Sequence, residues 1–472
     1  MQKSFTKNIF LLLGINLIIK PIYILGIDAK VQDSVGDETY GVYFALFNLC
    51  FLFKIFLDLG IYNFNAKYVS QNNEKVSEHF ADVVGLKLAL TGCFAIVVTV
   101  VAHILGYSLL EMKTLWLITA FFVLQSFFLY LRAHFSNLGF YAKDSVLSAV
   151  DKLLMIFIIG YFIYKLQDID IHKFILGQIA ALSIACAITL MLLSRKFSLS
   201  IRFSYSRSMA ILKQSLPFAL VIVLMSMYTR MDGVMLERIL DDNGASAGMY
   251  ARGYRILDAA NILGYLFASL LIPMFAKQLK ENEDINNLLH KAVSLLLSIA
   301  TIISIFCWWY AYDIMHLIYR NITTDHIEIF RILMVSFWSM SISYIFGSLI
   351  NATGKLKLLN ILFLAGIAIN WILNMYWIPM FGGQGAAYAT LITQTIVFIG
   401  QVIIVIRQFS VSFTILQLSK MVAFIGITWL LFSILYKNLE AHWMIQSLIA
   451  VSLSLTVSFL LGFIRLDLTE EN

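Results

Sequence analysis

The chain has 472 residues, of which 60% are hydrophobic and only 13% are charged, with a formal net charge of +6. Soluble domains contain roughly 45–50% apolar and about 25% charged residues, so this composition excludes a soluble globular protein and indicates a polytopic membrane protein. The four cysteines and eight histidines are scattered without metal-ligand spacing, so we expect no metal site and no cofactor.

Apolar segments that are long enough to cross a bilayer follow one another along the whole chain. A helix needs about 20 predominantly apolar residues to cross the hydrocarbon. Short connections separate the fourteen segments that meet this requirement, which are 8–27, 40–62, 81–105, 114–135, 145–165, 173–194, 212–238, 248–275, 288–311, 328–350, 356–378, 384–406, 416–436 and 443–464. The sequence therefore predicts an all-α membrane protein with fourteen transmembrane helices and no soluble domain.

The distribution of Lys and Arg predicts how these helices are oriented, because basic residues concentrate in cytoplasmic connections. An even number of helices places both termini on one side, and the connections on that side carry most of the basic residues outside the membrane. We therefore expect both termini in the cytoplasm. The main cytoplasmic linker then contains Arg195, Lys196, Arg202, Arg207 and Lys213.

This linker separates two groups of six helices that look like copies of one another. After the first helix of each half come similar sequences, GVYFALF from Gly41 and GMYARGY from Gly248. Later in each half come NLGFYAKDSVL from Asn137 and NATGKLKLLNI from Asn351. Six helices per copy require parallel repeats, which form two lobes with the substrate site between them. We predict an N-lobe at 1–194, the linker at 195–212, a C-lobe at 213–410, and two additional helices with the cytoplasmic C-terminus at 411–472.

Three stretches resemble one known family. Residues 370–390 read NWILNMYWIPMFGGQGAAYAT, residues 216–236 read LPFALVIVLMSMYTRMDGVML, and residues 40–69 read YGVYFALFNLCFLFKIFLDLGIYNFNAKYV. Together they are similar to the Wzx-type polysaccharide (O-antigen) flippases of the multidrug/oligosaccharidyl-lipid/polysaccharide (MOP) exporter superfamily. That superfamily also holds the lipid II flippases and the MATE drug antiporters.

The resemblance implies a flippase of the bacterial inner membrane that works by alternating access. Its substrate would be an undecaprenyl-pyrophosphate-linked oligosaccharide repeat unit destined for a surface polysaccharide of the O-antigen or capsule type. The implied partners are this lipid-linked oligosaccharide, membrane lipids, a polysaccharide polymerase and a chain-length regulator, and we expect no nucleic acid. The motif at 370–390 itself favours a compact helical hairpin over a substrate site, because Asn370 and Asn374 share a helix face and Pro379 precedes a glycine-rich turn.

Charged side chains at membrane depth are the candidate site residues, because a charge there costs at least ~2.5–3.5 kcal/mol and usually faces a cavity or a partner. Positive charges outnumber negative ones in these segments, which suggests an anionic group supplied from outside. A pyrophosphate suits this surplus, since a planar guanidinium binds phosphate oxygens in pairs. We predict a cationic substrate-binding cavity formed by Arg230, Arg255, Arg252, Lys20 and Lys54.

Helical spacing assigns different roles to the charges on the seventh and eighth helices. Arg230 and Asp232 are two residues apart and point to nearly opposite faces, so we expect Arg230 to face the cavity. Asp232 would then contact the eighth helix, with Arg252 or Arg255 as its partner. Two alternatives remain open: Arg255 pairs with Asp258 within one helix, and Arg252 extends to the outer interface.

The charges of the first lobe leave similar alternatives. Lys20 lies on a polar stripe of the first helix, whereas Lys54 and Asp58 are four residues apart and can neutralise each other. We expect Lys87 to extend toward the cytoplasm. Candidate carboxylates for coupling to Na⁺ or H⁺, or for tethering helices, are Asp58, Asp232 and Asp258.

Two other functions compete with the flippase. A MATE-like cation-coupled multidrug antiporter would be expected to carry acidic residues in the first lobe, which here holds Lys20, Lys54 and Lys87 against Asp58. A membrane polysaccharide polymerase or ligase would need a sizeable outer loop for its catalytic groups, and every predicted outer loop is short. We therefore expect a transporter without catalytic residues rather than an enzyme.

Overall fold

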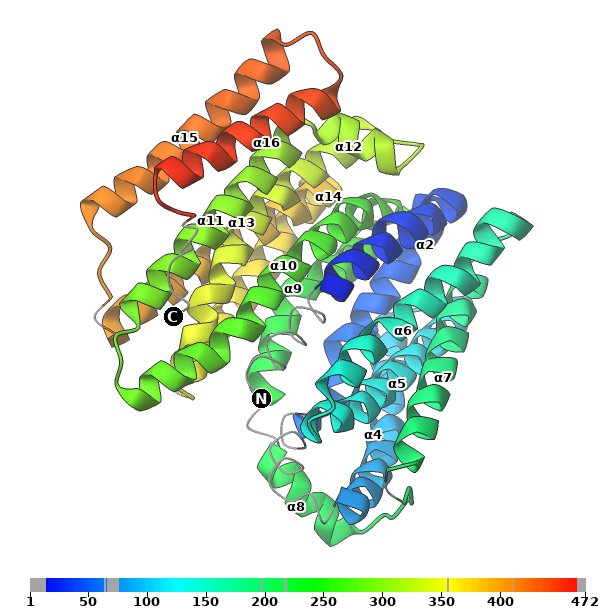
Figure 1. The fold of residues 1–472 in the computed structure, drawn as a ribbon. Coiled ribbons are helices and arrows are strands. Elements are labelled where there is room, and N and C mark those ends of the chain that lie inside the picture. The colour runs from blue at the N-terminus through cyan, green and yellow to red at the C-terminus, as the bar shows by residue number, and fades with distance from the viewer. Residues whose placement is uncertain are drawn as a thin grey trace. The chain divides into compact units, whose positions relative to one another are not determined.

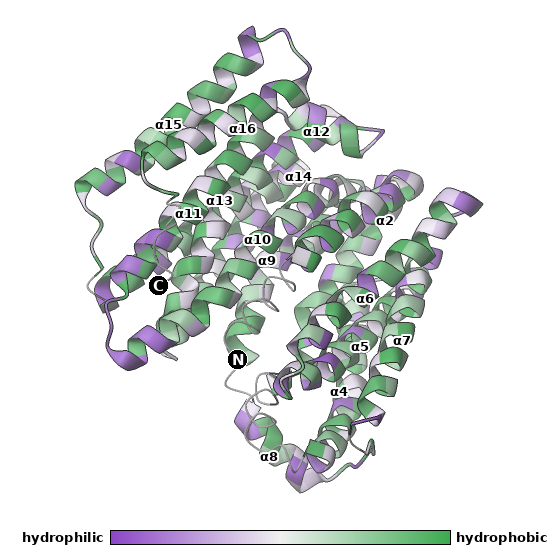
Figure 2. Cartoon of the chain, viewed as in Figure 1, coloured by the Kyte–Doolittle hydropathy of each residue, from purple (hydrophilic) through white to green (hydrophobic). Residues whose placement is uncertain are grey.

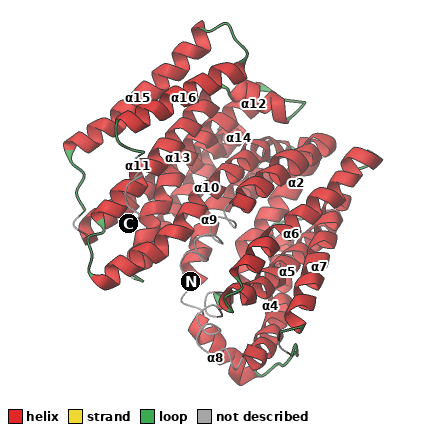
Figure 3. Cartoon of the chain, viewed as in Figure 1, coloured by secondary structure: helices red, strands yellow, loops and turns green. Residues whose placement is uncertain are grey.

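A computed structural model describes residues 14–62, 65, 76–196, 198–215, 219–354, 356–409 and 411–464. Every regular element within these ranges is a helix, and none of the described residues forms a strand (Figure 3). The start of the first predicted span at 8–13, residues 216–218 of the seventh, and the predicted cytoplasmic C-terminus at 465–472 lie outside the described residues. The prediction of an all-α membrane protein is confirmed.

The chain divides into two compact units, Met1–Ala251 and Arg252–Asn472. The division lies within one helix, α10, rather than in the linker at 195–212, so the lobe boundaries stay a prediction. The first unit contains η1 (Ile22–Asp28), α2 (Ala29–Phe53), η2 (Lys54–Leu57), α4 (Val76–Ile104), α5 (Leu109–Asn137), α6 (Tyr141–Gly160), η4 (Tyr161–Leu166), α7 (Ile171–Ser194), α8 (Tyr205–Ser215), α9 (Ala219–Ile239) and the start of α10 (Ala245–Glu281) (Figure 1). The second contains the rest of α10 with α11 (Asn286–Trp309), α12 (Ala311–Ile318), α13 (Thr324–Ala352), α14 (Lys357–Phe409), α15 (Ile415–Asn438) and α16 (Trp443–Leu460).

Twelve helical segments among the described residues are long and apolar enough to cross a membrane, and hydrophobic residues predominate along them (Figure 2). Two of these segments are far longer than one crossing requires, Gly14–Leu57 with 44 residues and Lys357–Phe409 with 53. At a rise of 1.5 Å per residue they would extend ~65 and ~80 Å, against a hydrocarbon core of ~30 Å. Each is broken at a glycine with a positive φ, Gly36 at 79° and Gly382 at 54°. Each therefore supplies two membrane helices, and the predicted fourteen are present.

The first helical break differs from the prediction, which placed a loop between residues 27 and 40. The chain stays helical through the polar residues after Ile27 and turns only at Gly36. These polar residues are buried rather than solvated: Asp28 is 3% exposed and accepts a hydrogen bond of 2.7 Å from the hydroxyl of Tyr40. Just before them, η1 is a π-helical segment that follows Pro21, whose missing N–H favours a local change of helix geometry.

The linker also contains a helix that the sequence did not predict, α8, which packs against α4. The Arg207 guanidinium donates to Asp82 at 3.0 Å, and the backbone N–H of Arg202 donates to the carbonyl of Ala81 at 3.0 Å. Gly85 permits this approach, because a Cβ there would lie 2.7 Å from the carbonyl carbon of Arg202 and nearer still to its oxygen. These contacts fix the linker against α4 in the first unit.

In the second unit, α13 packs between α11 and α14, and the α15–α16 pair packs on α11. The hydroxyl of Ser458 on α16 donates to that of Ser298 on α11 at 2.9 Å, with both side chains buried. The outer faces of the pair are apolar, as in Val422 (71% exposed) and Leu460 (77% exposed). Such a surface is suited to lipid contact.

Candidate anion site

The site begins with two helices, α2 and α9, that glycines bring close together. A Cβ at Gly233 on α9 would lie 2.7 Å from the ring of Phe44 on α2. Five residues after the kink of α2 at Gly36, a Cβ at Gly41 would lie 2.7 Å from the nitrogen of Gly248 and nearer still to the oxygen of Gly244. Conversely, a Cβ at Gly248 would lie 2.7 Å from the Cα of Asp37. Gly41 thus contacts Gly244, four residues before Gly248, and Gly248 contacts Asp37, four residues before Gly41. The two contacts are equivalent, as expected for helices α2 and α10 related by a local two-fold axis.

Lys54 and Arg230 converge on the ring of Phe51 within this unit. The Lys54 Nζ lies 3.4 Å from the ring centroid and the Arg230 Cζ lies 4.7 Å from it. Both side chains are half-buried. Cation–π attraction holds each of them on the ring, while the two positive charges repel each other. The structure therefore brings together two of the five predicted cavity cations, from the end of α2 and from α9.

Lys87 and Asp58 form an ion pair whose carboxylate acts on Lys54. The α-helix ends at Phe53, and the single 3₁₀ turn that follows leaves carbonyl groups without helical partners. The Lys87 ammonium, 1% exposed, donates to the carbonyl of Leu57 at 2.9 Å and to the hydroxyl of Ser126 at 2.8 Å, and lies 3.7 Å from the Asp58 carboxylate. The prediction that Lys87 extends to the cytoplasm is wrong, because a carbonyl at the helix end and a carboxylate hold it inside the protein.

Asp58 therefore forms an ion pair with Lys87, although its charge also acts on Lys54. Its carboxylate accepts the backbone N–H of Tyr62 at 3.2 Å as well. Three cationic side chains, Lys54, Lys87 and Arg230, gather around this carboxylate and the Phe51 ring. That these cations line a substrate cavity, as the sequence suggested, stays a prediction.

Lys20 lies in a second charged cluster of the first unit, built on α6. The charges that act on it come from Lys152, Asp151 and Arg132. Tyr23, which shares the polar stripe with Lys20, also faces this cluster, since the Lys152 ammonium lies 4.8 Å from the centroid of its ring. The structure thus places Lys20 among fixed ion pairs rather than beside Lys54 and Arg230.

Sequence reasoning missed this cluster. Lys152 and Asp151 lie 3.5 Å apart and well inside the predicted span 145–165, and Arg132 pairs with Asp144 at 2.6 Å. The site prediction was based on the surplus of positive charge at membrane depth, to which the adjacent Asp151 and Lys152 contribute nothing. Arg132 and Asp144 lie near the ends of predicted spans. Counting charged residues span by span would have found the first pair.

Asp232 joins α9 to α10 within the first unit. It is 1% exposed and accepts a hydrogen bond of 2.9 Å from the hydroxyl of Tyr250. This contact is to α10, the helix on which the sequence placed a partner for Asp232. The partner in the contact is a tyrosine, which the spacing of charged residues does not reveal. On the same helix Glu237 accepts a hydrogen bond of 2.9 Å from the hydroxyl of Tyr107, so α9 is anchored at two points.

The other predicted cations, Arg252 and Arg255, lie in the second unit. Arg252 is 2% exposed, donates to the carbonyl of Asn321 at 3.2 Å and lies 5.1 Å from the ring of Tyr319. It thus turns into the protein rather than toward the aqueous interface. Arg255 lies 3.7 Å from Asp258 one turn later, the intrahelical pair that the sequence left open. These contacts give both arginines structural partners, and their part in binding stays a prediction.

The motif at 370–390 forms the expected hairpin. The chain turns at Gly382, and a Cβ at Gly385 would lie 2.6 Å from the carbonyl carbon of Trp377 and nearer still to its oxygen. Asn374 donates to the side chain of Asn370 at 3.1 Å, and both are fully buried. Within the described ranges, no group of three or more His, Cys, Asp or Glu side chains has the arrangement of a metal site.

The model of the family "Polysaccharide biosynthesis protein" matches residues 5–279. A curated relative, an uncharacterized membrane protein of Methanocaldococcus jannaschii, is 26% identical over 197 residues, which cover 42% of this chain and 46% of the relative. The aligned part therefore spans about half the length of that relative.

Several solved structures share the fold over most of the chain. The lipid II flippase MurJ in an inward closed conformation has a TM-score of 0.70 at 16% identity, covering 93% of this chain and 96% of its own. A MATE transporter of Vibrio cholerae has a TM-score of 0.60 at 16% identity, covering 86% and 98%. A MOP superfamily transporter from Pyrococcus furiosus, described as having a binding pocket of reverse polarity, has a TM-score of 0.60 at 14% identity, covering 86% and 96%. At these identities the likeness shows the fold.

Proposed function

Because the chain belongs to the polysaccharide biosynthesis protein family of the MOP superfamily of membrane transporters, we propose that it moves a lipid-linked oligosaccharide across the membrane. The substrate of this proposal is an undecaprenyl-pyrophosphate-linked repeat unit, passed from the cytoplasmic to the outer leaflet of a bacterial inner membrane. A polymerase and a chain-length regulator would then assemble the surface polysaccharide. No bond is made or broken in the step itself.

The convergence of Lys54 and Arg230 on Phe51 carries the proposal. Two positive charges held 3.4 and 4.7 Å from one ring centroid repel each other, which raises the electrostatic energy of the site. A pyrophosphate relieves this repulsion, since its several oxygens accept from the ammonium and from both edges of the guanidinium at once. The ring limits the water around both cations, which strengthens their attraction for an anion.

Translocation would proceed by alternating access of the two predicted lobes. The pyrophosphate and the sugars would pass through a polar path while the lipid tail stays in the bilayer. Close packing of α2 against α9 and α10 at the glycines would close the transport path to one side of the membrane. Separation of these helices would open the path to that side.

Coupling to Na⁺ or H⁺ is part of the same proposal, with Asp58, Asp232 and Asp258 as candidate carboxylates. Asp232 is the most enclosed of them, at 1% exposed, and hydrogen-bonds to a neutral hydroxyl. An enclosed carboxylate of this kind is a candidate for changing its charge state or binding a cation during transport. We therefore place Asp232 first among the three.

A multidrug antiporter of the MATE type fits the site less well. Lys54 and Arg230 lie on the ring of Phe51, and the Asp58 carboxylate, whose charge acts on Lys54, is paired with Lys87. An organic cation would meet repulsion there, whereas an anionic head group is attracted. The sign of the charge favours the flippase.

The test is mass spectrometry of lipid-linked glycans from the source strain with the gene deleted and then restored as variants. We expect a polyprenyl-linked repeat unit to accumulate in the deletion strain and to disappear on complementation with the wild type. Arg230→Gln and Lys54→Gln should each restore flux poorly, and Arg230→Lys should restore it in part, because it keeps the charge and loses the planar fork.

Arg331→Gln is the matched control, since Arg331 also lies over an aromatic ring, that of Trp308, in the second unit. It should complement fully at equal protein levels. Normal glycan display by the Arg230→Gln/Lys54→Gln double variant would contradict the anion site. A deletion strain without accumulated lipid-linked glycan would contradict the proposed substrate.

A further inference from the structure

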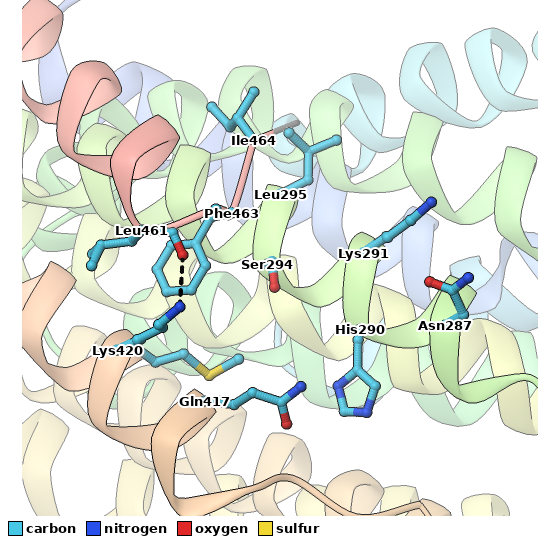
Figure 4. Close-up of a pocket in the computed structure, with 12 residues that line it drawn as sticks. Asn287, His290, Lys291, Ser294, Leu295, Gln417, Lys420, Leu461, Phe463 and Ile464 are labelled. Carbon is cyan, nitrogen blue, oxygen red and sulfur yellow. Dashed lines mark hydrogen bonds between the residues drawn. The ribbon is translucent and has the colours of Figure 1, made fainter. Parts of the chain in front are cut away.

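The second unit contains a pocket of about 560 Å³ at one end of α11, α15 and α16. Figure 4 shows polar side chains of α11 on one side of it, the start of α15 below, and the residues after α16 beside them. This size lies within the range of small-molecule sites, about 300–1,000 Å³. Its lining residues are Asn287, His290, Lys291, Ser294, Leu295, Gln417, Lys420, Met421, Leu461, Gly462, Phe463 and Ile464.

The polar part of this lining is basic. Lys291 on α11 and Lys420 on α15 carry positive charges, and none of the described residues that line the pocket is Asp or Glu. The Lys420 ammonium donates to the carbonyl of Leu461 at 3.3 Å, just beyond the end of α16, which fixes its position at the wall (Figure 4). The His290 ring contacts Phe413 edge to face at 4.8 Å between centroids. Asn287, Ser294 and Gln417 add neutral hydrogen-bonding groups.

The remaining lining is apolar and continues onto a lipid-facing surface. Leu295, Met421 and Ile464 line the pocket. Beside it on the same helices, Val422 and Leu460 are 71% and 77% exposed. The pocket thus lies where basic groups give way to apolar surface, which is the position of the head groups of a bilayer.

All three helices reach this pocket with the ends that are predicted to be cytoplasmic. The leaflet on that side carries the anionic lipids of the membrane, which attract basic side chains. From the charge, the volume and the apolar continuation together, we propose that the pocket binds the phosphate head group of an acidic glycerophospholipid of that leaflet. The acyl chains lie along α15 and α16, and the site shares no residue with the Lys54–Arg230 pair.

The experiment measures retention of phosphatidylglycerol by the purified full chain in native mass spectrometry, with phosphatidylcholine as the zwitterionic comparison. We expect the wild type to retain phosphatidylglycerol selectively. Each lysine near a charged lipid surface contributes about 1 kcal/mol, so Lys420→Gln and Lys291→Gln should each weaken binding about fivefold and the double variant roughly 25-fold.

Lys277→Gln is the matched control, because Lys277 is a 72% exposed lysine of the same unit, lies 3.8 Å from Glu281 and does not line the pocket. It should bind as the wild type does. Lys291→Glu provides a second variant at an exposed position, so that its loss of binding is not a loss of folding. Equal retention of phosphatidylglycerol by the double variant and the control would overturn the proposal. So would equal retention of the two lipids, or displacement of the lipid by inorganic phosphate at similar concentration.

Discussion

The close approach of α2 to the start of α10 rests on Gly41, and replacing it by alanine tests that contact. The added Cβ would lie 2.7 Å from the Gly248 nitrogen and nearer to the Gly244 oxygen, whereas real Cβ contacts essentially never fall below 3.0 Å. The helices must separate by about 0.3 Å to clear the nitrogen alone and by more to clear the oxygen. Overpacking of this kind costs about 1–3 kcal/mol, against a gain of roughly 0.5–1 kcal/mol from replacing a helical glycine. The clash is therefore expected to dominate.

The measurement is the thermal unfolding of purified wild type, Gly41→Ala and Gly92→Ala in one detergent. Gly92, on α4, has no atom within 4 Å of the position its Cβ would take, so Gly92→Ala should melt at or above the wild-type temperature. Gly41→Ala should melt below it. Because Gly248 meets the same contact from the other side, Gly41→Ala/Gly248→Ala should cost less than the two single costs together.

Two results would refute this reasoning. If Gly41→Ala melts as high as Gly92→Ala, the helices are not held in contact by the missing side chain. If the double variant loses as much as the two single variants combined, the glycines act at independent positions. Either outcome would also remove the contact as a candidate closing point for alternating access.

Two further predictions concern buried cations. Lys87→Met should destabilise the protein by about 3–5 kcal/mol, because it leaves the Asp58 carboxylate and the Leu57 carbonyl without their cation. Lys87→Met/Asp58→Asn should recover part of that loss in the same melting assay, and a double variant no more stable than the single one would contradict the pairing. Arg252→Lys should cost about 1.5–3 kcal/mol through loss of its hydrogen bond to the Asn321 carbonyl; an unchanged melting temperature would show that this bond contributes nothing.

Much of the fold could be read from local sequence. Runs of about 20 apolar residues predict membrane helices because the hydrocarbon core has a fixed thickness, and the fourteen predicted helices are present. The glycine-rich turn at Gly382 was predicted for a similar local reason, since its positive φ suits glycine. The first turn was misplaced because Asp28 and its neighbours are polar and suggest a loop, although in the structure Tyr40 binds that buried carboxylate.

Periodicity showed which helix faces are polar, but it could not pair them. Arg230 and Lys54 are far apart in the chain, and only the packing of α2 against α9 sets both on the ring of Phe51. Lys87 was expected to reach the cytoplasm because its distance from the end of a helix is visible in the sequence. The free carbonyl of Leu57 that binds it instead appears only when α2 ends early.

The sequence by itself thus determined the class of protein and the number of membrane helices. These follow from composition and from spacing along one helix, which are local properties. Tertiary structure decided which charges share an environment, where Arg252 and Asp232 find their partners, and where basic residues of α11 and α15 line one pocket. Such contacts join residues that are distant in the chain, so they depend on how the helices pack and not on the pattern within any one of them.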